Sequence, residues 1–162
     1  MTSITCLPQK ICSWNYLITV SNSDVTASVE FDFMSERGNI ILEADSYKIE
    51  HAWLSGEWSL ELAGEIIAVA IKPNLFTRLF QIDYDSQKLV LKAQSPFARS
   101  FAIEQNDTSI GTIEPIHLLT RRATVNCSAN VPIPIQIFLF WLTVLMWRRD
   151  KSSQNANASQ TI

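Results

Sequence analysis

"VPIPIQIFLFWLTVLMWRRD", residues 131–150, is the most apolar stretch of this 162-residue chain and lies close to its C-terminus. Pro132 and Pro134 suit the first turn of a helix, where the missing N–H group costs nothing, so we expect a helix to start near Pro134. A helix that is apolar on every face belongs either in lipid or in the middle of a protein. The stretch therefore decides between a membrane anchor and a buried core helix.

The length and flanks of this segment favour the buried helix. At about 1.5 Å per residue, Pro134 to Trp147 spans roughly 21 Å and Val131 to Trp147 roughly 26 Å, against a hydrocarbon core of about 30 Å. If the rest of the chain were cytosolic, Arg148, Arg149 and Lys151 would have to be translocated, against the positive-inside tendency. If it were external, it would need an export signal, and none is visible. The alternatives are a single transmembrane helix at 131–147 and an interfacial helix.

The region from Ser13 to Asn126 alternates apolar and polar residues with period two, in short segments separated by turn residues such as Gly56, Gly64 and "QNDTS". Such segments, rich in β-branched and aromatic residues, predict strands at the spacing of a sandwich or a barrel. The predicted strands are 14–20, 25–33, 39–44, 47–53, 58–62, 66–71, 78–84, 88–93, 99–105, 109–115 and 121–126.

Strands and helix together predict an all-β fold with one central α-helix. A closed antiparallel barrel of about twelve strands leaves a lumen too wide for its own side chains to fill, and a hydrophobic C-terminal helix inside it would fill that space. Gln136 and Thr143 would each need a hydrogen-bond partner inside. The helix residues expected to face the strands are Phe138, Phe140, Trp141, Leu142, Leu145, Met146 and Trp147.

The length of the chain is typical of one domain. We expect residues 1–12 to be an N-terminal lead-in, residues 13–149 to form the barrel with its central helix at 132–149, and residues 150–162 to be a disordered polar tail. Cys6, Cys12 and Cys127 lack metal-type spacing, and we interpret them as reduced thiols of a cytoplasmic chain.

Charge is distributed unevenly along the sequence. Residues 1–120 hold 8 Lys/Arg and 15 Asp/Glu, whereas residues 121–162 hold 5 Lys/Arg and 1 Asp/Glu. An acidic body argues against a nucleic-acid partner, because phosphate binding needs a concentrated basic face.

The rhythm "LVLKAQSPFARSFAIEQNDTSIGTIEP" followed by an apolar C-terminal helix resembles the tubby C-terminal-like superfamily, which includes tubby proteins, phospholipid scramblases and LURP-one-related proteins. Phe101 to Ile103 and Ile110 to Ile113 match its strand, "F-x-I", turn, "I-G-x-I" element. The resemblance covers roughly Trp14 to Arg149 and implies a twelve-stranded barrel around a hydrophobic helix. Tubby domains bind phosphoinositides through basic residues on the barrel, but no matching basic cluster is recognisable here, nor are the calcium-linked and palmitoylated segments of scramblases.

The sequence offers few chemical sites. His51 and His117 have no metal ligand at suitable spacing, and the acidic residues of "DYD" (83–85) and "DTS" (107–109) suit turns rather than a cation. No nucleophile elbow or phosphate-binding glycine loop is present, so we expect no enzymatic activity, no metal and no cofactor.

Two arginine pairs are the better candidates for a binding site. Arg121, Arg122, Arg148 and Arg149 flank the apolar stretch and could contact anionic lipid headgroups, with Trp141 or Trp147 at an interface. The alternative is that Arg148 and Arg149 stabilise the C-terminus of the helix, where free carbonyls favour cations. The sequence thus predicts a non-enzymatic binding or scaffold module of unknown ligand, cytoplasmic and associated with anionic membranes; the alternative is a β domain with a single-pass anchor.

Overall fold

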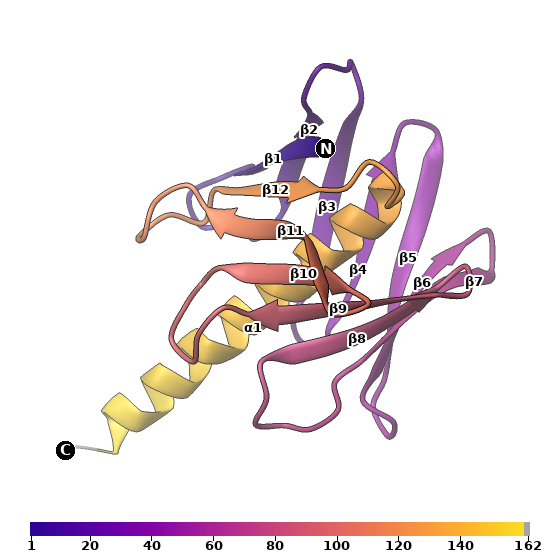
Figure 1. The fold of residues 1–162 in the computed structure, drawn as a ribbon. Helices are drawn as coiled ribbons and strands as arrows, with labels where there is room; N and C mark the ends of the chain where they lie inside the picture. The colour runs from indigo at the N-terminus through magenta and orange to yellow at the C-terminus, as the bar shows by residue number, and fades with distance from the viewer. Residues whose placement is uncertain (161–162) are drawn as a thin grey trace.

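The computed structural model describes residues 1–160 and consists of twelve β-strands followed by one long α-helix (Figure 1). The strands are β1 (Thr2–Pro8), β2 (Tyr16–Val20), β3 (Thr26–Asp32), β4 (Arg37–Leu42), β5 (Asp45–Ala52), β6 (Glu57–Leu62), β7 (Glu65–Ile71), β8 (Leu79–Tyr84), β9 (Gln87–Ala93), β10 (Phe101–Gln105), β11 (Thr108–Pro115) and β12 (Ala123–Cys127). The helix, α1, spans Ile133–Ser159.

Each strand pairs antiparallel with its neighbours in sequence, and β1 pairs with both β2 and β12, which closes the barrel. The predicted closed twelve-stranded barrel with a C-terminal helix is confirmed. Because consecutive strands are antiparallel, the connections between them lie alternately at the two ends of the barrel. We call the end with loops 9–15, 33–36, 53–56, 72–78, 94–100 and 116–122 the helix-exit end, and the opposite end the hairpin end.

The hairpin end is made of tight turns. The residue pairs Ala63–Gly64, Asp85–Ser86 and Asn106–Asp107 all have positive φ, between 43° and 83°. Two consecutive residues with positive φ are typical of the type I′ turn, whose twist matches that of the flanking strands. The interpretation of the Asp85 and Asp107 segments as turns is therefore confirmed.

The helix runs through the barrel, so that Ile135 to Trp147 are all buried, and its yellow C-terminal part projects beyond the strands (Figure 1). All the helix residues predicted to face the strands are at most 5% exposed. The two buried polar residues bond to the backbone of their own segment: Gln136 Nε2 donates to the Val131 carbonyl at 2.7 Å, and Thr143 Oγ1 donates to that of Leu139 at 3.0 Å.

The helix packs tightly against the barrel wall where Trp141 meets β3 and β4. The Trp141 ring stacks on Phe31, with centroids 5.2 Å apart and planes 3° apart. A Cβ atom at Gly38 would lie 2.5 Å from Trp141 Nε1 and 2.4 Å from the Glu30 carbonyl oxygen. The absence of a side chain at Gly38 is therefore what admits this indole.

The structure differs from expectation at both ends of the chain. Residues 1–12 are not a lead-in, because Thr2–Pro8 forms the closing strand and turns Ile4 and Cys6 into the core, each with 0% exposure. Residues 150–160 are not a disordered tail, because α1 continues to Ser159; residues 161–162 lie outside the described part of the chain. Polar residues continue a helix readily once a buried segment has nucleated it.

Among residues 1–160, no helix combines the length and apolar character that a bilayer crossing requires.

We predict that Gly38→Ala destabilises the protein by about 1–3 kcal/mol, because the new methyl group must displace Trp141 or the β3 backbone. Thermal unfolding should show a melting temperature lower by about 3–10 °C for a domain of this size. Asn39→Ala, at the adjacent outward-facing position, serves as the control. Equal melting temperatures for the two variants would contradict the tight contact.

Candidate functional site

The four arginines selected from the sequence all lie at the helix-exit end. Arg121 and Arg122 belong to loop 116–122, and Arg148 and Arg149 lie where α1 leaves the barrel. The alternative role for Arg148 and Arg149, stabilising the helix C-terminus, is wrong, because the helix continues to Ser159 and its last turn holds no basic residue.

Arg121 fixes loop 9–15. Its guanidinium donates to the carbonyls of Ser13 (2.5 Å), Lys10 (3.3 Å) and Ile11, and lies 4.9 Å from the ring centroid of Trp14. Arg122 is exposed. Neither arginine forms an ion pair with a carboxylate of residues 1–160.

Arg149, in contrast, has its charge compensated. Its Nε and Nη2 donate to the two carboxylate oxygens of Glu36 at 2.9 and 2.7 Å, and its guanidinium lies 5.3 Å from the Trp58 ring. His51 stacks on Trp58 with centroids 4.4 Å apart, and its Nδ1 lies 3.4 Å from Glu36 Oε2. This group ties α1 to β5, β6 and loop 33–36, which points to a structural role for Arg149.

Arg148 packs on aromatic rings. Its guanidinium lies 5.3 Å from the Phe33 centroid and 5.9 Å from that of Trp14, and no carboxylate of the described residues pairs with it. Nearby, Lys72 donates to the carbonyls of Asn74, Leu75 and Thr77, so it organises loop 72–78. Burial, together with the charge of Arg149, lowers the pKa of Lys72 below its ordinary value.

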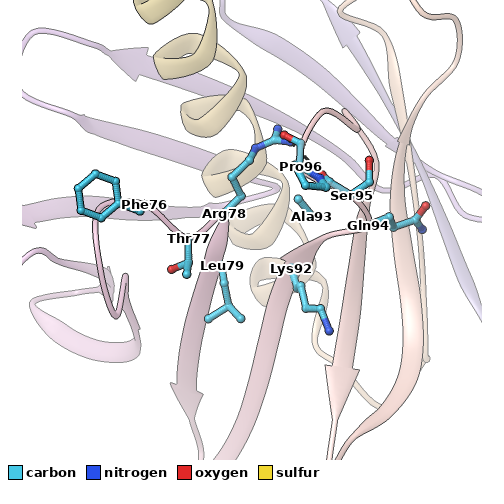
Figure 2. Close-up of a pocket in the computed structure, with 9 residues that line it drawn as sticks. All are labelled: Phe76, Thr77, Arg78, Leu79, Lys92, Ala93, Gln94, Ser95 and Pro96. Atoms are coloured by element: carbon cyan, nitrogen blue, oxygen red, sulfur yellow. Dashed lines mark hydrogen bonds between the residues drawn. The ribbon is translucent and has the colours of Figure 1, made fainter.

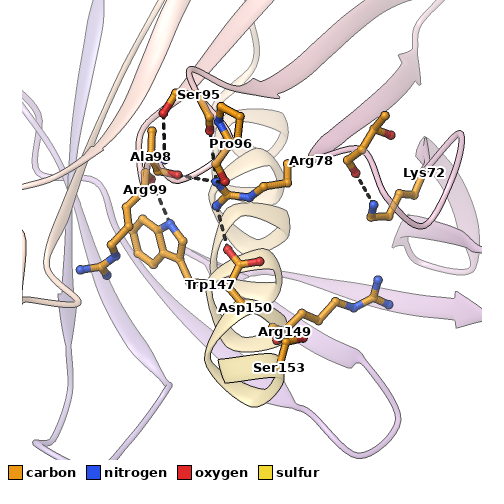
Figure 3. A network of polar contacts seen from close by, with 11 residues as sticks. Lys72, Arg78, Ser95, Pro96, Ala98, Arg99, Trp147, Arg149, Asp150 and Ser153 are labelled. Carbon is orange, nitrogen blue, oxygen red and sulfur yellow. Dashed lines mark hydrogen bonds and ion pairs between the residues drawn. The ribbon is translucent and has the colours of Figure 1, made fainter. Parts of the chain in front are cut away.

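Two further arginines at this end were missed by sequence reasoning. Arg78 donates through Nη1 to the carbonyls of Ser95 (3.3 Å), Pro96 (3.0 Å) and Ala98 (2.7 Å), and through Nη2 to Asp150 at 2.7 Å (Figure 3). It therefore connects loop 94–100 to the helix. Each contact joins segments distant in sequence, and no local motif could have indicated it.

Arg99 is the second. Its Nη1 donates to the Leu118 carbonyl at 2.8 Å, and its guanidinium lies 4.6 Å from the Trp147 ring centroid. Trp147 Nε1 in turn donates to the Arg99 carbonyl at 2.9 Å (Figure 3). Burial lowers the pKa of Arg99, which means that its charge is partly removed from water.

Large apolar side chains are exposed around the same arginines. Of the ten that are at least 75% exposed among residues 1–160, nine lie on loops of the helix-exit end, and the tenth is Met1. Four of the six loops, 53–56, 72–78, 94–100 and 116–122, contribute at least one strongly exposed Leu, Phe or Trp, and the other two contribute Ile11 and Met34. The nine are Ile11, Met34, Trp53, Leu54, Leu75, Phe76, Phe97, Leu118 and Leu119. Exposed apolar groups gathered on one face mark an interaction surface.

Clefts open between these loops and the emerging helix. One of about 620 Å³ lies between loops 94–100 and 116–122 and the helix, with Arg99, Arg121 and Lys151 in its wall. Figure 2 shows a second cleft, of about 460 Å³, between loops 72–78 and 94–100, where Arg78 and Lys92 provide the charged groups among apolar and backbone atoms. The arrangement can bind an anion with an apolar part.

No group of three or more His, Cys, Asp or Glu side chains within residues 1–160 could hold a metal ion. His51 belongs to the aromatic stack on Trp58, and His117 lies on loop 116–122. The three cysteines are free, Cys6 and Cys127 buried and Cys12 exposed.

Comparison with known proteins identified no match: no family model, no curated protein and no solved structure corresponds to this chain.

We predict that Arg78→Gln destabilises the protein by about 1.5–3 kcal/mol, because three loop carbonyls and Asp150 lose a charged donor. Thermal melting should reveal the loss, and amide hydrogen exchange should accelerate in residues 94–100. Lys92→Gln is the matched control, since Lys92 is a half-exposed cation whose pair with Glu104 spans 3.6 Å and such pairs contribute about 1 kcal/mol or less. Equal effects of the two substitutions would show that Arg78 does not organise the loop.

The cysteines give a separate test of the barrel. Burial raises the pKa of Cys6 well above its ordinary value and that of Cys127 to about 11. Since the thiolate is the reactive form, we expect a thiol reagent at neutral pH to label Cys12 alone in the folded protein and all three cysteines in denaturant. Rapid labelling of Cys6 or Cys127, read by peptide mass spectrometry, would contradict a closed β1–β12 seam.

Proposed function

We propose that the protein is a non-enzymatic binding module that docks on anionic membrane surfaces through its helix-exit end. The observation that carries the proposal is the coincidence, at one end of the barrel, of nearly all strongly exposed apolar side chains with cations that no carboxylate compensates. Apolar groups that enter the interface and basic groups that meet anionic headgroups are the two components of reversible membrane binding.

The opposite end supports the proposed orientation. Its turns and the adjoining strand ends carry acidic residues, whereas Lys88 is the cation among them. An anionic surface repels this end and attracts the helix-exit end, so the charge distribution turns the barrel in one direction as it approaches. The acidic residues concerned are Asp24, Glu43, Asp45, Glu65, Asp85 and Asp107.

The projecting part of α1 limits how the barrel meets lipid. Lys151 to Ser159 are exposed and, apart from Ala156 and Ala158, polar, and hydrocarbon has no partners for polar groups. We therefore place this extension in the headgroup layer, with the neighbouring loops 94–100 and 116–122 against the bilayer. Residues of both loops and of the extension line one cleft, so they lie close enough to meet the same surface.

We also propose that the chain belongs to the tubby-like group, because the fold that the resemblance implies, a twelve-stranded barrel around a hydrophobic helix, is the fold observed. The single-pass anchor is the weaker hypothesis, because Ile135 to Trp147, the residues it would need in lipid, fill the barrel. An enzymatic role has no residues in its favour among those described.

Co-sedimentation with vesicles tests the proposal. We expect the wild-type protein to bind vesicles rich in phosphatidylserine, to bind phosphatidylcholine vesicles much more weakly, and to lose affinity as salt is added. The triple variant Phe97→Ser, Leu118→Ser, Leu119→Ser should bind at least tenfold more weakly while melting normally, because these side chains are 84–100% exposed.

Ile66→Ser is the control for the apolar change. Ile66 is 61% exposed on β7, beside the Ala63–Gly64 turn at the hairpin end. Its substitution should leave vesicle binding unchanged. Absence of wild-type binding to anionic vesicles, or an equal loss in the Ile66 variant, would refute docking through the helix-exit end.

A further inference from the structure

We propose that the cleft between loop 94–100, loop 116–122 and the projecting helix is a specific site for the phosphate-ester headgroup of a membrane lipid, bound by Arg99, Arg121 and Lys151. This inference rests on the proposed function and deepens it, since it turns a general attraction to anionic surfaces into recognition of one chemical group. The cleft has a volume of about 620 Å³, ample for a headgroup, and opens at the end of the barrel that faces lipid.

The charges in the cleft favour an anion. Asp150 is its one acidic residue, and Asp150 is already paired with Arg78 at 2.7 Å. Arg99, Arg121 and Lys151 form no ion pair with any carboxylate of residues 1–160. Three cations with no compensating carboxylate therefore line one concave surface, and an incoming anion would offset their mutual repulsion.

Arg99 has the donors that such an anion needs. Within the described chain it uses Nη1 alone, on the Leu118 carbonyl, so that Nε and Nη2 are left for another acceptor. A guanidinium binds phosphate oxygens through parallel N–H groups, which an ammonium cannot do. Its partial burial makes each such bond stronger than on an open surface.

Stacking on tryptophan rings holds both guanidinium groups in place before a ligand arrives. Arg99 lies over Trp147 at 4.6 Å and Arg121 over Trp14 at 4.9 Å. The backbone bond from Trp147 Nε1 to the Arg99 carbonyl also fixes the position of that ring. Because little side-chain freedom is left to lose, binding costs less entropy.

The rim of the cleft selects an amphiphile over a free phosphate. Phe97, Leu118 and Leu119 stand at its edge with 95%, 84% and 100% exposure. A phosphate held by Arg99 would place the attached glycerol and acyl chains against these side chains. The site therefore matches a phospholipid anchored in a bilayer.

The test compares Arg99→Gln and Lys151→Gln with the control Lys88→Gln, which removes the same charge at the hairpin end. Binding is measured on phosphatidic acid vesicles and on phosphatidylserine vesicles of equal charge. We expect Arg99→Gln and Lys151→Gln to weaken binding to phosphatidic acid about tenfold or more, with little change for Lys88→Gln. Arg99→Lys should recover less than half of the binding free energy that Arg99→Gln loses, because lysine restores the positive charge but not the planar guanidinium with its parallel N–H groups.

Two soluble probes, dihexanoyl phosphatidic acid below its micelle concentration and inorganic phosphate, are titrated against the full chain by tryptophan fluorescence. We expect the short-chain lipid to bind more tightly than phosphate, with Arg99→Gln weakening it. Equal affinity for the two probes would assign the cleft to free phosphate and overturn the lipid assignment. Equal effects of Arg99→Gln and Lys88→Gln on both probes would overturn the site.

The soluble probes also separate this inference from the proposed function. If wild-type protein ignored anionic vesicles but bound the short-chain lipid through Arg99, docking would fail and the headgroup site would stand. If it bound vesicles equally with and without Arg99, docking would stand and the site would fail. Melting temperatures of all variants show that each is folded, and Lys151, exposed on the projecting helix, provides a substitution without packing cost.

Discussion

The barrel depends on one constraint, that a lumen of twelve strands must be filled by something other than its own side chains. Helix α1 fills it: thirteen consecutive residues, Ile135 to Trp147, are buried on every face. The helix depends on the barrel in turn, because a helix that is apolar on every face needs a complete wall of strands around it. Wall and helix therefore stabilise each other, and the position of the helix is set where Gly38 leaves room for Trp141.

That placement also builds the candidate site. Because the helix is fixed inside the barrel, Arg149 and Asp150 leave it at defined positions relative to the loops. Arg149 pairs there with Glu36 and Asp150 with Arg78, each at 2.7 Å. These pairs connect the helix to two separate loops of the rim, 33–36 and 72–78. The charges of Arg149 and Arg78 are thereby compensated, whereas Arg99 and Arg121 have no carboxylate partner among residues 1–160.

The sequence predicted the parts governed by local pattern. Eleven strands followed from period-two alternation, and the buried helix followed from its length and uniform apolarity. The strand Thr2–Pro8 was missed because it is short and ends in proline, and because one of its two partners, β12, lies more than a hundred residues away. Arg78 and Arg99 were missed for a related reason. Each begins a predicted strand, and its hydrogen bonds reach a neighbouring loop that comes close only in the folded barrel. The extension of α1 was missed because its polar sequence forms helix only as the continuation of a buried one.

The chemical difference between the two ends follows from topology. In an up-and-down barrel every second connection lies at the same end, so each end can evolve its own kind of loop. At the hairpin end the turns require positive φ, which favours Asn, Asp and Gly and makes that end polar and acidic.

At the helix-exit end the loops must instead make room for an emerging helix. Loops 9–15, 94–100 and 116–122 are held by arginines bonded to their carbonyls, which leaves their tips with no structural task. Those tips, such as Phe97 and Leu119, carry apolar side chains that the fold does not need. Since apolar surface that stabilises nothing inside the molecule is costly in water, its concentration at this one end is the strongest indication that the end meets a surface outside.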